Sequence, residues 1–148
     1  NTTNQMEFPM SHPLSAPVLS RLSSLSAELS ELCGLCDLLA DPMPQNFVFA
    51  SLRTLSDTAE DASETLGQFA DETRDTPQRI LPALLDGYAR NLAFVPPVMN
   101  ALAAASDAEQ RLALEWIGHL TGKCVSTAGR LACEIVKELE AQPLEVLA

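Results

Sequence analysis

The sequence predicts an all-α fold, a bundle of four main helices that begins with a helical hairpin and ends with a long C-terminal helix. Only 5% of the 148 residues are aromatic, whereas Leu, Ala and Ser are abundant. This composition favours helices packed through aliphatic side chains over a sheet. Apolar residues recur at spacings of three and four, the period of an amphipathic helix, and prolines separate these stretches.

Two regions are expected along the chain. Residues 1–17 are polar, contain three prolines and show no period, so they predict a flexible N-terminal arm. Residues 18–148 predict a single helical-bundle domain, long enough to bury a core without a metal or a disulfide. Its first helix runs from Val18 to the DPMP stretch at 41–44, with an apolar stripe made of Leu22, Leu25, Leu29, Leu32, Cys36 and Leu39.

The second helix is expected over 48–73, where the same spacing continues. Because only a few residues join it to the first, the two helices should form an antiparallel hairpin. A third helix is predicted over about 77–94, with Pro82 in its first turns or at a kink.

Pro96 and Pro97 should break the chain again, before a short helix over 98–105. The final helix is predicted to extend to about residue 142. Ser106 and Glu109 have the spacing of a capping box, which would begin this helix.

The composition excludes several classes of function. A net charge of −11 argues against direct binding of nucleic acid or of an anionic membrane, because Lys and Arg carry such binding. No apolar run approaches about 18 residues, so no membrane span is expected. Four cysteines in a chain that can build its own core favour a reducing compartment. We therefore expect a cytoplasmic protein of bacterial type.

The predicted second helix has an acidic face. Eleven acidic residues and two arginines lie between Glu28 and Asp75, so nine of the eleven net negative charges belong to the first half. This face is either a solvated surface or one that attracts a basic partner. In the second case it could imitate the charge of nucleic acid toward a DNA-binding protein. Six carboxylates fall within an arc of about 120° opposite the apolar stripe: Asp57, Glu60, Asp61, Glu64, Asp71 and Glu72.

The predicted last helix has a stripe of small residues. Each glycine destabilises a helix by about 1 kcal/mol relative to Ala, so we expect a close neighbour to offset this loss. Close packing inside the bundle and a homodimer seam are two explanations. The third is a break near Gly122 that turns Trp116 and His119 toward a cleft. The stripe consists of Gly118, Gly122, Ser126, Gly129 and Cys133.

The cysteines predict no metal or redox site. Cys33 and Cys36 form a CxxC motif, but such motifs gain reactivity at a helix N-terminus, whereas this pair lies near a C-terminal end. Cys36 instead takes a leucine position in the apolar stripe. Cys124 and Cys133 are about 180° apart on a continuous helix, so the four thiols cannot share one zinc ion.

No catalytic or cofactor-binding residue is predicted either. Of the two histidines, His12 lies in the arm, and His119 follows Glu115 by four residues. A carboxylate-bridged metal site in a bundle needs Glu-x-x-His spacings on two helices, and none occurs. The glycine-flanked nucleophile turn and the phosphate-binding loop are also absent from the sequence. An enzyme is therefore not expected.

Residues 80–117, ILPALLDGYARNLAFVPPVMNALAAASDAEQRLALEWI, resemble the middle of the ligand-binding domains of TetR-type repressors. The resemblance implies helices that surround an apolar pocket. The positions where such repressors carry a basic helix-turn-helix hold the acidic hairpin here. A pocket for a small apolar ligand would be lined by Leu85, Tyr88, Leu92, Trp116 and Leu120.

The function predicted first is that of a small acidic regulator or inhibitor that binds another protein with a basic surface, such as a DNA-binding protein. The acidic face would speed the encounter, and an exposed part of the leucine stripes or of the small-residue stripe would supply the buried contact. A helical module that binds a small molecule and a structural homodimer are the two alternatives.

Overall fold

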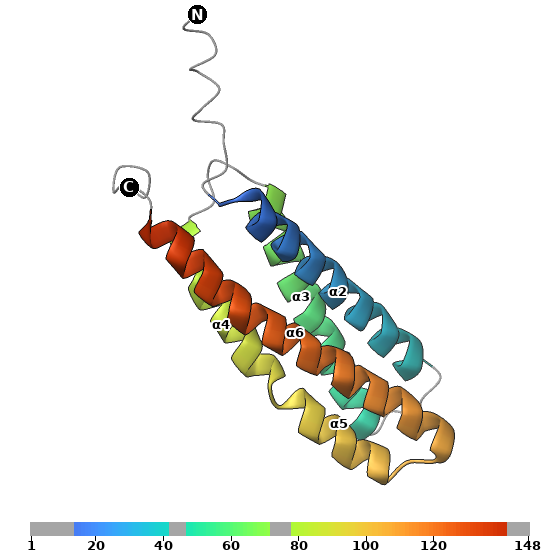
Figure 1. Ribbon diagram of the computed structural model, residues 1–148. Helices are drawn as coiled ribbons and strands as arrows, with labels where there is room; N and C mark the ends of the chain where they lie inside the picture. Colours follow the sequence, from blue (N-terminus) through green and yellow to red (C-terminus); the bar gives the residue numbers. More distant parts are fainter. Residues whose placement is uncertain (1–13, 42–46, 72–77, 142–148) are drawn as a thin grey trace, which may run out of the picture.

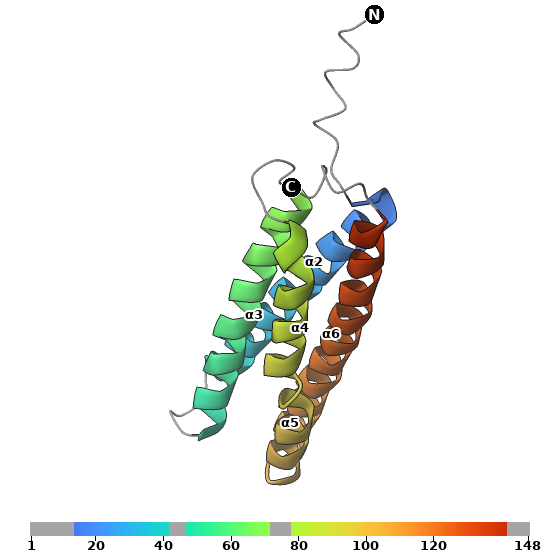
Figure 2. The ribbon, with the colours of Figure 1, turned by 90° about the vertical axis from the view of Figure 1, so that its left-hand side faces the viewer.

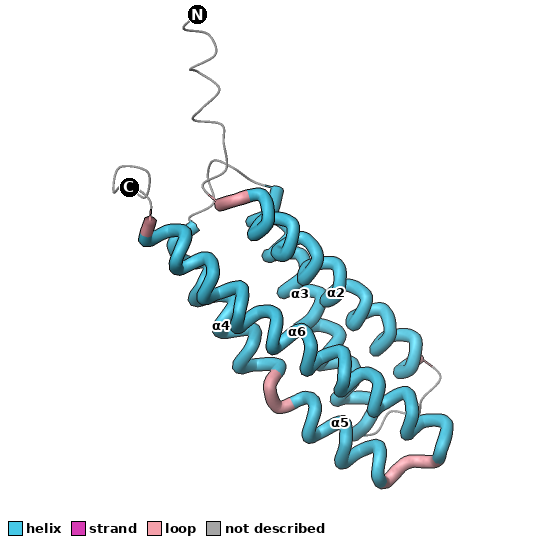
Figure 3. The backbone as a smooth tube through the Cα atoms, viewed as in Figure 1, coloured by secondary structure: helices cyan, strands magenta, loops and turns pink. Residues whose placement is uncertain are grey.

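The computed structural model describes residues 14–41, 47–71 and 78–141 and confirms the predicted all-α bundle. In these residues α2 pairs with α3, α4 and α5 follow one another along α6, and α2 packs on α6 (Figure 1). Short turns join α4 to α5 and α5 to α6 (Figure 3). The elements are α2 (Ala16–Ala40), α3 (Phe47–Asp71), the 3-10 helix η2 (Gln78–Ile80), α4 (Leu81–Leu92), α5 (Val95–Ala104) and α6 (Ala108–Glu140).

Helix α2 begins at Ala16, two residues before the predicted start at Val18. Ser15 is the N-cap, and its side chain accepts a hydrogen bond from the Val18 N–H. Pro17 lies in the first turn, where its missing N–H needs no partner. The capping residue, which the pattern of apolar residues does not reveal, therefore decides where α2 begins.

The start of α2 is also tied to the end of α6. Leu14 is buried, and the N–H and hydroxyl of Ser15 both donate to the Glu138 carboxylate. About one turn before Glu138 on α6, Glu134 pairs with Arg21 of α2. Residues 14–17 thus belong to the bundle, contrary to the predicted arm. The rest of that arm, residues 1–13, lies outside the described residues.

Helices α2 and α3 form the predicted antiparallel hairpin (Figure 1). At mid-length each helix donates a serine hydroxyl to a backbone carbonyl of the other. Ser26 Oγ bonds the Ser63 oxygen and Ser63 Oγ bonds the Ser26 oxygen, both at 2.7 Å. A Cβ on Gly67 would lie 3.2 Å from Ser26 Oγ. Small side chains therefore allow the two helices to approach closely at this point.

Helices α4 and α5 form the third column of the bundle, one beyond the other (Figure 2). Pro82 lies in the first turn of α4, as predicted. Pro96 and Pro97 do not precede α5 but form part of its first turn, so the helix begins three residues earlier than predicted. A proline is tolerated there because the first N–H groups of a helix have no partner inside it.

Helix α6 is continuous over 33 residues, through Gly122. The long C-terminal helix is therefore found as predicted, and a break near this glycine, one of the three explanations of the small-residue stripe, does not occur. Its N-cap is Asp107, whose side chain accepts from the Gln110 N–H at 2.9 Å. The expected capping box of Ser106 and Glu109 is also wrong, because the Ser106 hydroxyl donates to the Leu102 carbonyl and helps to end α5.

The core lies between the pairs α2–α3 and α4/α5–α6. It is built almost entirely of aliphatic side chains from all five α-helices. None of the described helices is long and apolar enough to cross a membrane. The largest fully buried side chains are Leu22, Leu25, Leu29, Leu32, Leu52, Leu66, Leu81, Leu85, Met99, Leu114, Leu131 and Ile135.

Candidate protein-interaction surface

The acidic face predicted from the sequence lies on the outward side of α3. Asp57, Glu60, Asp61, Glu64 and Asp71 are all exposed, and Glu72 lies outside the described residues. None of the five pairs with a Lys or Arg among the residues that the structure describes. Their charge is therefore not neutralised within the described bundle.

Among the described residues, the arginine nearest to these carboxylates in the sequence is engaged elsewhere. Arg53 of α3 donates to Asp37 of α2, with Nη1 at 2.7 Å from Oδ1. Arg90 likewise pairs with Asp86 on its own helix, at 3.3 Å. Both contacts leave the α3 carboxylates available to a positive charge from outside.

Beside this face, a groove separates α3 from the α4–α5 elbow. It has a volume of about 310 Å³ and no charged residue in its lining. We call it the α3–α5 groove. On the α3 side it is lined by Ala50, Ser51, Thr54, Leu55 and Thr58, and on the other side by Asn91, Leu92, Phe94, Val95, Val98 and Met99.

The groove exposes apolar surface at its rim. Phe94 is 72% exposed and Val98 39% exposed, whereas Leu92 and Met99 are buried at its base. A large aromatic side chain left this exposed beside an apolar hollow is typical of a surface that contacts another molecule. Neither Phe94 nor Val98 belonged to a site predicted from the sequence.

The groove stays open because of how the helices pair. α3 packs mainly on α2, while α4 and α5 pack on α6, so α3 and α5 are not each other's main partners. Apart from the buried Leu55, the side chains that α3 presents there are small, and Ala50, Ser51 and Thr54 cannot reach across the space. The hollow is thus a consequence of residue size at one helix face.

The acidic face and the groove share one edge of α3. At 100° per residue, Thr54 in the groove and Asp61 in the acidic face are about 20° apart around the helix. Asp57 lies about 60° from Thr54 and borders the groove on its outer side. An occupant of the groove would therefore reach carboxylates without leaving this edge.

The pocket predicted around Trp116 does not form as expected. Leu85 and Leu92 are buried in the core, whereas Trp116 is 55% exposed on α6 and lies beside His119, with ring centroids 5.5 Å apart and the rings tilted by 30°. Leu120 instead faces α2, in a small hollow of about 120 Å³ that also involves Glu28 and Glu31. Tyr88 packs against the core with part of its side chain. The rotation of α6 about its axis separates Trp116 from the interior.

The small-residue stripe of α6 divides into two parts. A Cβ on Gly118 would lie 3.3 Å from the Met99 Cβ, and one on Gly122 would lie 3.8 Å from Pro96. These two glycines allow α5 to pack closely inside the bundle. Ser126 and Cys133 are exposed, and nothing lies within 4 Å of a Cβ placed on Gly129. Close packing in the bundle thus explains only the first part of the stripe.

The CxxC motif is part of the α2–α3 contact. Cys36 is fully buried in the core, as predicted, and burial, together with the nearby Cys33 and Asp37, raises the pKa of its thiol to about 12. A thiol that keeps its proton at neutral pH is a poor nucleophile and a poor metal ligand. Burial also raises the pKa of Cys124 to about 11. In the described residues no three His, Cys, Asp or Glu side chains form a group able to hold a metal.

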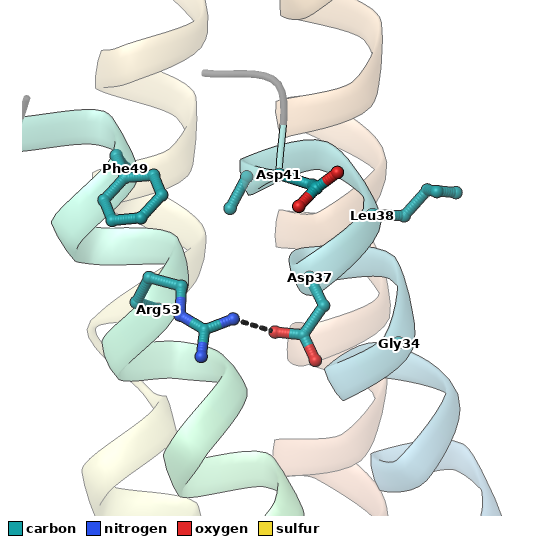
Figure 4. A pocket seen from close by; sticks show the side chains of 7 residues that line it. Gly34, Asp37, Leu38, Asp41, Phe49 and Arg53 are labelled. Carbon is teal, nitrogen blue, oxygen red and sulfur yellow. Dashed lines mark hydrogen bonds and ion pairs between the residues drawn. The ribbon is translucent and has the colours of Figure 1, made fainter. Parts of the chain in front are cut away.

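Cys33 contributes to a polar cluster between the two helices that the sequence did not reveal. Its Sγ lies 3.2 Å from the buried Ser56 Oγ, which donates to Asp37 Oδ1 at 2.6 Å. Asp37 also accepts from Arg53 beside an open hollow of about 730 Å³ (Figure 4).

Comparison with family models, curated proteins and solved structures finds no match for this chain. The resemblance of residues 80–117 to TetR-type ligand-binding domains therefore has no support from these comparisons.

Proposed function

We propose that this protein is a small acidic regulator that binds a basic, apolar segment of another protein in the α3–α5 groove. One observation carries the proposal: an uncharged groove with an exposed aromatic rim lies on the same edge of α3 as carboxylates that have no partner among the described residues. Apolar side chains of the segment would fill the groove, and its Lys or Arg residues would face Asp57 and Asp61.

The two parts of the surface would have different roles. Burial of apolar area at Phe94 and Val98 supplies most of the stability of such a complex, at roughly 25 cal/mol per Å². The carboxylates mainly raise the association rate and select basic segments over acidic ones. Binding would block whatever the basic segment otherwise contacts, which is how the protein would regulate or inhibit its partner. The proposal involves no catalytic step.

A protein segment suits the groove better than a small apolar ligand. The hollow of about 310 Å³ is near the lower limit for ligand pockets. It has an exposed rim and a charged flank, whereas such pockets usually enclose most of their ligand. The composition favours a cytoplasmic location for this complex. The proposed partner is a protein with a basic surface.

The test uses a fluorescent synthetic helix of about 15 residues, built of Leu, Ala and Lys with Leu at every third and fourth position. We expect it to bind the wild-type protein at low salt and to dissociate as salt rises, because screening weakens the attraction of the carboxylates. Fluorescence anisotropy measures the affinity. A peptide with Glu in place of Lys should not bind.

Two pairs of variants separate the groove from the rest of the surface. Phe94→Ser with Val98→Ser should weaken binding at least about tenfold, the equivalent of about 1.4 kcal/mol. Leu112→Ser with Val136→Ser is the matched control, because these side chains are 70% and 38% exposed on α6, away from the groove. If both pairs bind the peptide equally well, the groove is not the binding site.

A second comparison tests the acidic face. Asp57→Asn, Asp61→Asn and Glu64→Gln together should weaken binding at low salt and flatten its salt dependence. Glu109→Gln, Glu115→Gln and Glu140→Gln change the net charge equally at exposed positions of α6. An equal loss from both triple variants would mean that only the overall charge matters.

A further inference from the structure

The α3–α5 groove and the carboxylates occupy different lengths of α3, which constrains the segment that fits. Groove residues of α3 run from Ala50 to Thr58, about 12 Å along the axis. The exposed carboxylates run from Asp57 to Asp71, about 21 Å. The two stretches overlap only at residues 57 and 58, so the surface changes from uncharged to acidic along the helix.

We infer that the partner segment is bipartite, with about two turns of apolar side chains next to a separate run of Lys or Arg, rather than a helix whose basic residues are spread along its whole length. This inference rests on the proposed function and specifies the partner's sequence. The reason is desolvation: a Lys placed over the groove would meet no carboxylate in its lining and would cover apolar surface instead.

The opposite wall of the groove supports the same division. The elbow residues Phe94, Val95 and Val98 are apolar, and the charged pair nearest to them in α4, Asp86 and Arg90, is joined on its own helix. Neither wall therefore offers an unpaired carboxylate at the level of the elbow. The first available one in α3 is Asp57, at the edge of the groove.

The experiment compares two peptides of identical composition that contain only Leu, Ala, Gln and Lys. In the first, Leu occupies two consecutive turns of one face and all Lys residues follow in the next turns. In the second, the same Leu positions are kept but Lys and Gln alternate along the whole length. We expect the first peptide to bind at least about fivefold more tightly, which corresponds to about 1 kcal/mol.

Protein variants then show which part of the peptide meets which part of the protein. The double variant Phe94→Ser, Val98→Ser should weaken binding of the first peptide. It should no longer do so once the Leu residues of that peptide are changed to Ala. The double variant Asp57→Asn, Asp61→Asn should likewise weaken binding of the first peptide, but not once the Lys residues of that peptide are changed to Gln. Such selective loss identifies contacts between specific pairs of groups.

The outcomes separate the two proposals. If neither the mixed nor the bipartite peptide binds, the proposed function fails. If both bind equally and both lose affinity with Phe94→Ser and Val98→Ser, the groove function stands and the bipartite inference is overturned. Removing Lys from the peptide could instead abolish the effect of the groove variants on affinity and leave that of the carboxylate variants. The assignment of Leu to the groove and of Lys to the carboxylates would then be wrong. Circular dichroism of each variant verifies that its helices are retained.

Discussion

The two long edges of α3 are packed in different ways. Along the edge facing α2, Ser26 and Ser63 exchange hydrogen bonds with backbone carbonyls, and Ser56 joins Asp37 of α2 to the buried Cys33. Along the edge facing the α4–α5 elbow, the α3 side chains border a groove of about 310 Å³. One helix thus has a closed edge and an open edge.

The difference shows that small polar residues can close a helix contact or leave it open. Ser26 and Ser63 close theirs because each hydroxyl finds a carbonyl on the other helix and Gly67 allows close approach. On the other edge, Thr58 satisfies its hydroxyl within α3 by donating to the Thr54 carbonyl at 3.0 Å. A hydroxyl has one proton to donate, so Thr58 has none left to donate across the groove.

The largest expected effect tests whether the open edge contributes to stability. Leu52 of α3 is fully buried, so Leu52→Ala should lower the free energy of unfolding by about 2–5 kcal/mol. Phe94→Ala at the groove rim should change it by less than about 0.5 kcal/mol. Urea unfolding followed by circular dichroism measures both. Equal losses would show that the groove is closed in solution.

The closed edge depends on its polar cluster. Asp37→Ala removes the acceptor of the buried Ser56 hydroxyl and the partner of Arg53, so we expect a loss of about 1–3 kcal/mol. Asp61→Ala, an exposed carboxylate by the groove, should stay within about 0.5 kcal/mol of wild type. The same urea unfolding experiment measures the free energy of unfolding of both variants. A negligible loss for Asp37→Ala would mean that the cluster does not hold α2 and α3 together.

Alkaline pH should weaken the core of the bundle through the buried Cys36. Burial raises its pKa from 9.0 to about 12 in the folded protein, so above pH 9 the unfolded chain loses a proton that the folded protein keeps. The stabilising effect of Cys36 is therefore complete below pH 9 and declines between pH 9 and 12, by about 1.4 kcal/mol per pH unit.

The measurement compares wild type with Cys36→Ala. The difference between their free energies of unfolding should shift by this amount as pH rises through that window. Leu52→Ala removes no titratable group, so its difference from wild type should stay constant over the same range. A constant difference for Cys36→Ala as well would show that its thiol is not desolvated.

The smallest expected effect concerns the two parts of the glycine stripe. Gly129→Ala should stabilise the protein by about 0.5–1 kcal/mol, because open space surrounds the new methyl group and Ala favours the helix. Gly118→Ala should gain less or destabilise, since its methyl group would lie 3.3 Å from the Met99 Cβ. Equal gains would show that α5 does not pack closely on α6.

The fold was largely predictable because the spacing of apolar residues along each helix can be read from the sequence without knowing which helices pack against one another. Cys36, Leu32 and Leu66 are buried where the helical stripe places them. Element ends were less predictable. Ser15 and Asp107 cap their helices, and Pro96 and Pro97 begin α5 instead of separating it from α4. Caps and first turns depend on one side chain each, which a periodic pattern does not resolve.

Of the candidate surface, the sequence pointed only to the charged half. Asp57, Glu60 and Asp61 are exposed, as expected from their position opposite the apolar stripe. Phe94 and Val98 gave no comparable signal, because an apolar residue beside two prolines is equally compatible with a core position. Trp116 shows the converse, since the alternative function placed it in an apolar pocket and it is 55% exposed.

The sequence by itself determined the helices, the buried stripes and the acidic face of α3, because helical period and charge are local properties of the chain. The tertiary structure decided which edge of α3 is closed, where Phe94 lies and which glycines face another helix. These features depend on the rotation and pairing of whole helices, which the packing of side chains from distant segments fixes together. The α3–α5 groove therefore arises only from the tertiary arrangement of the helices.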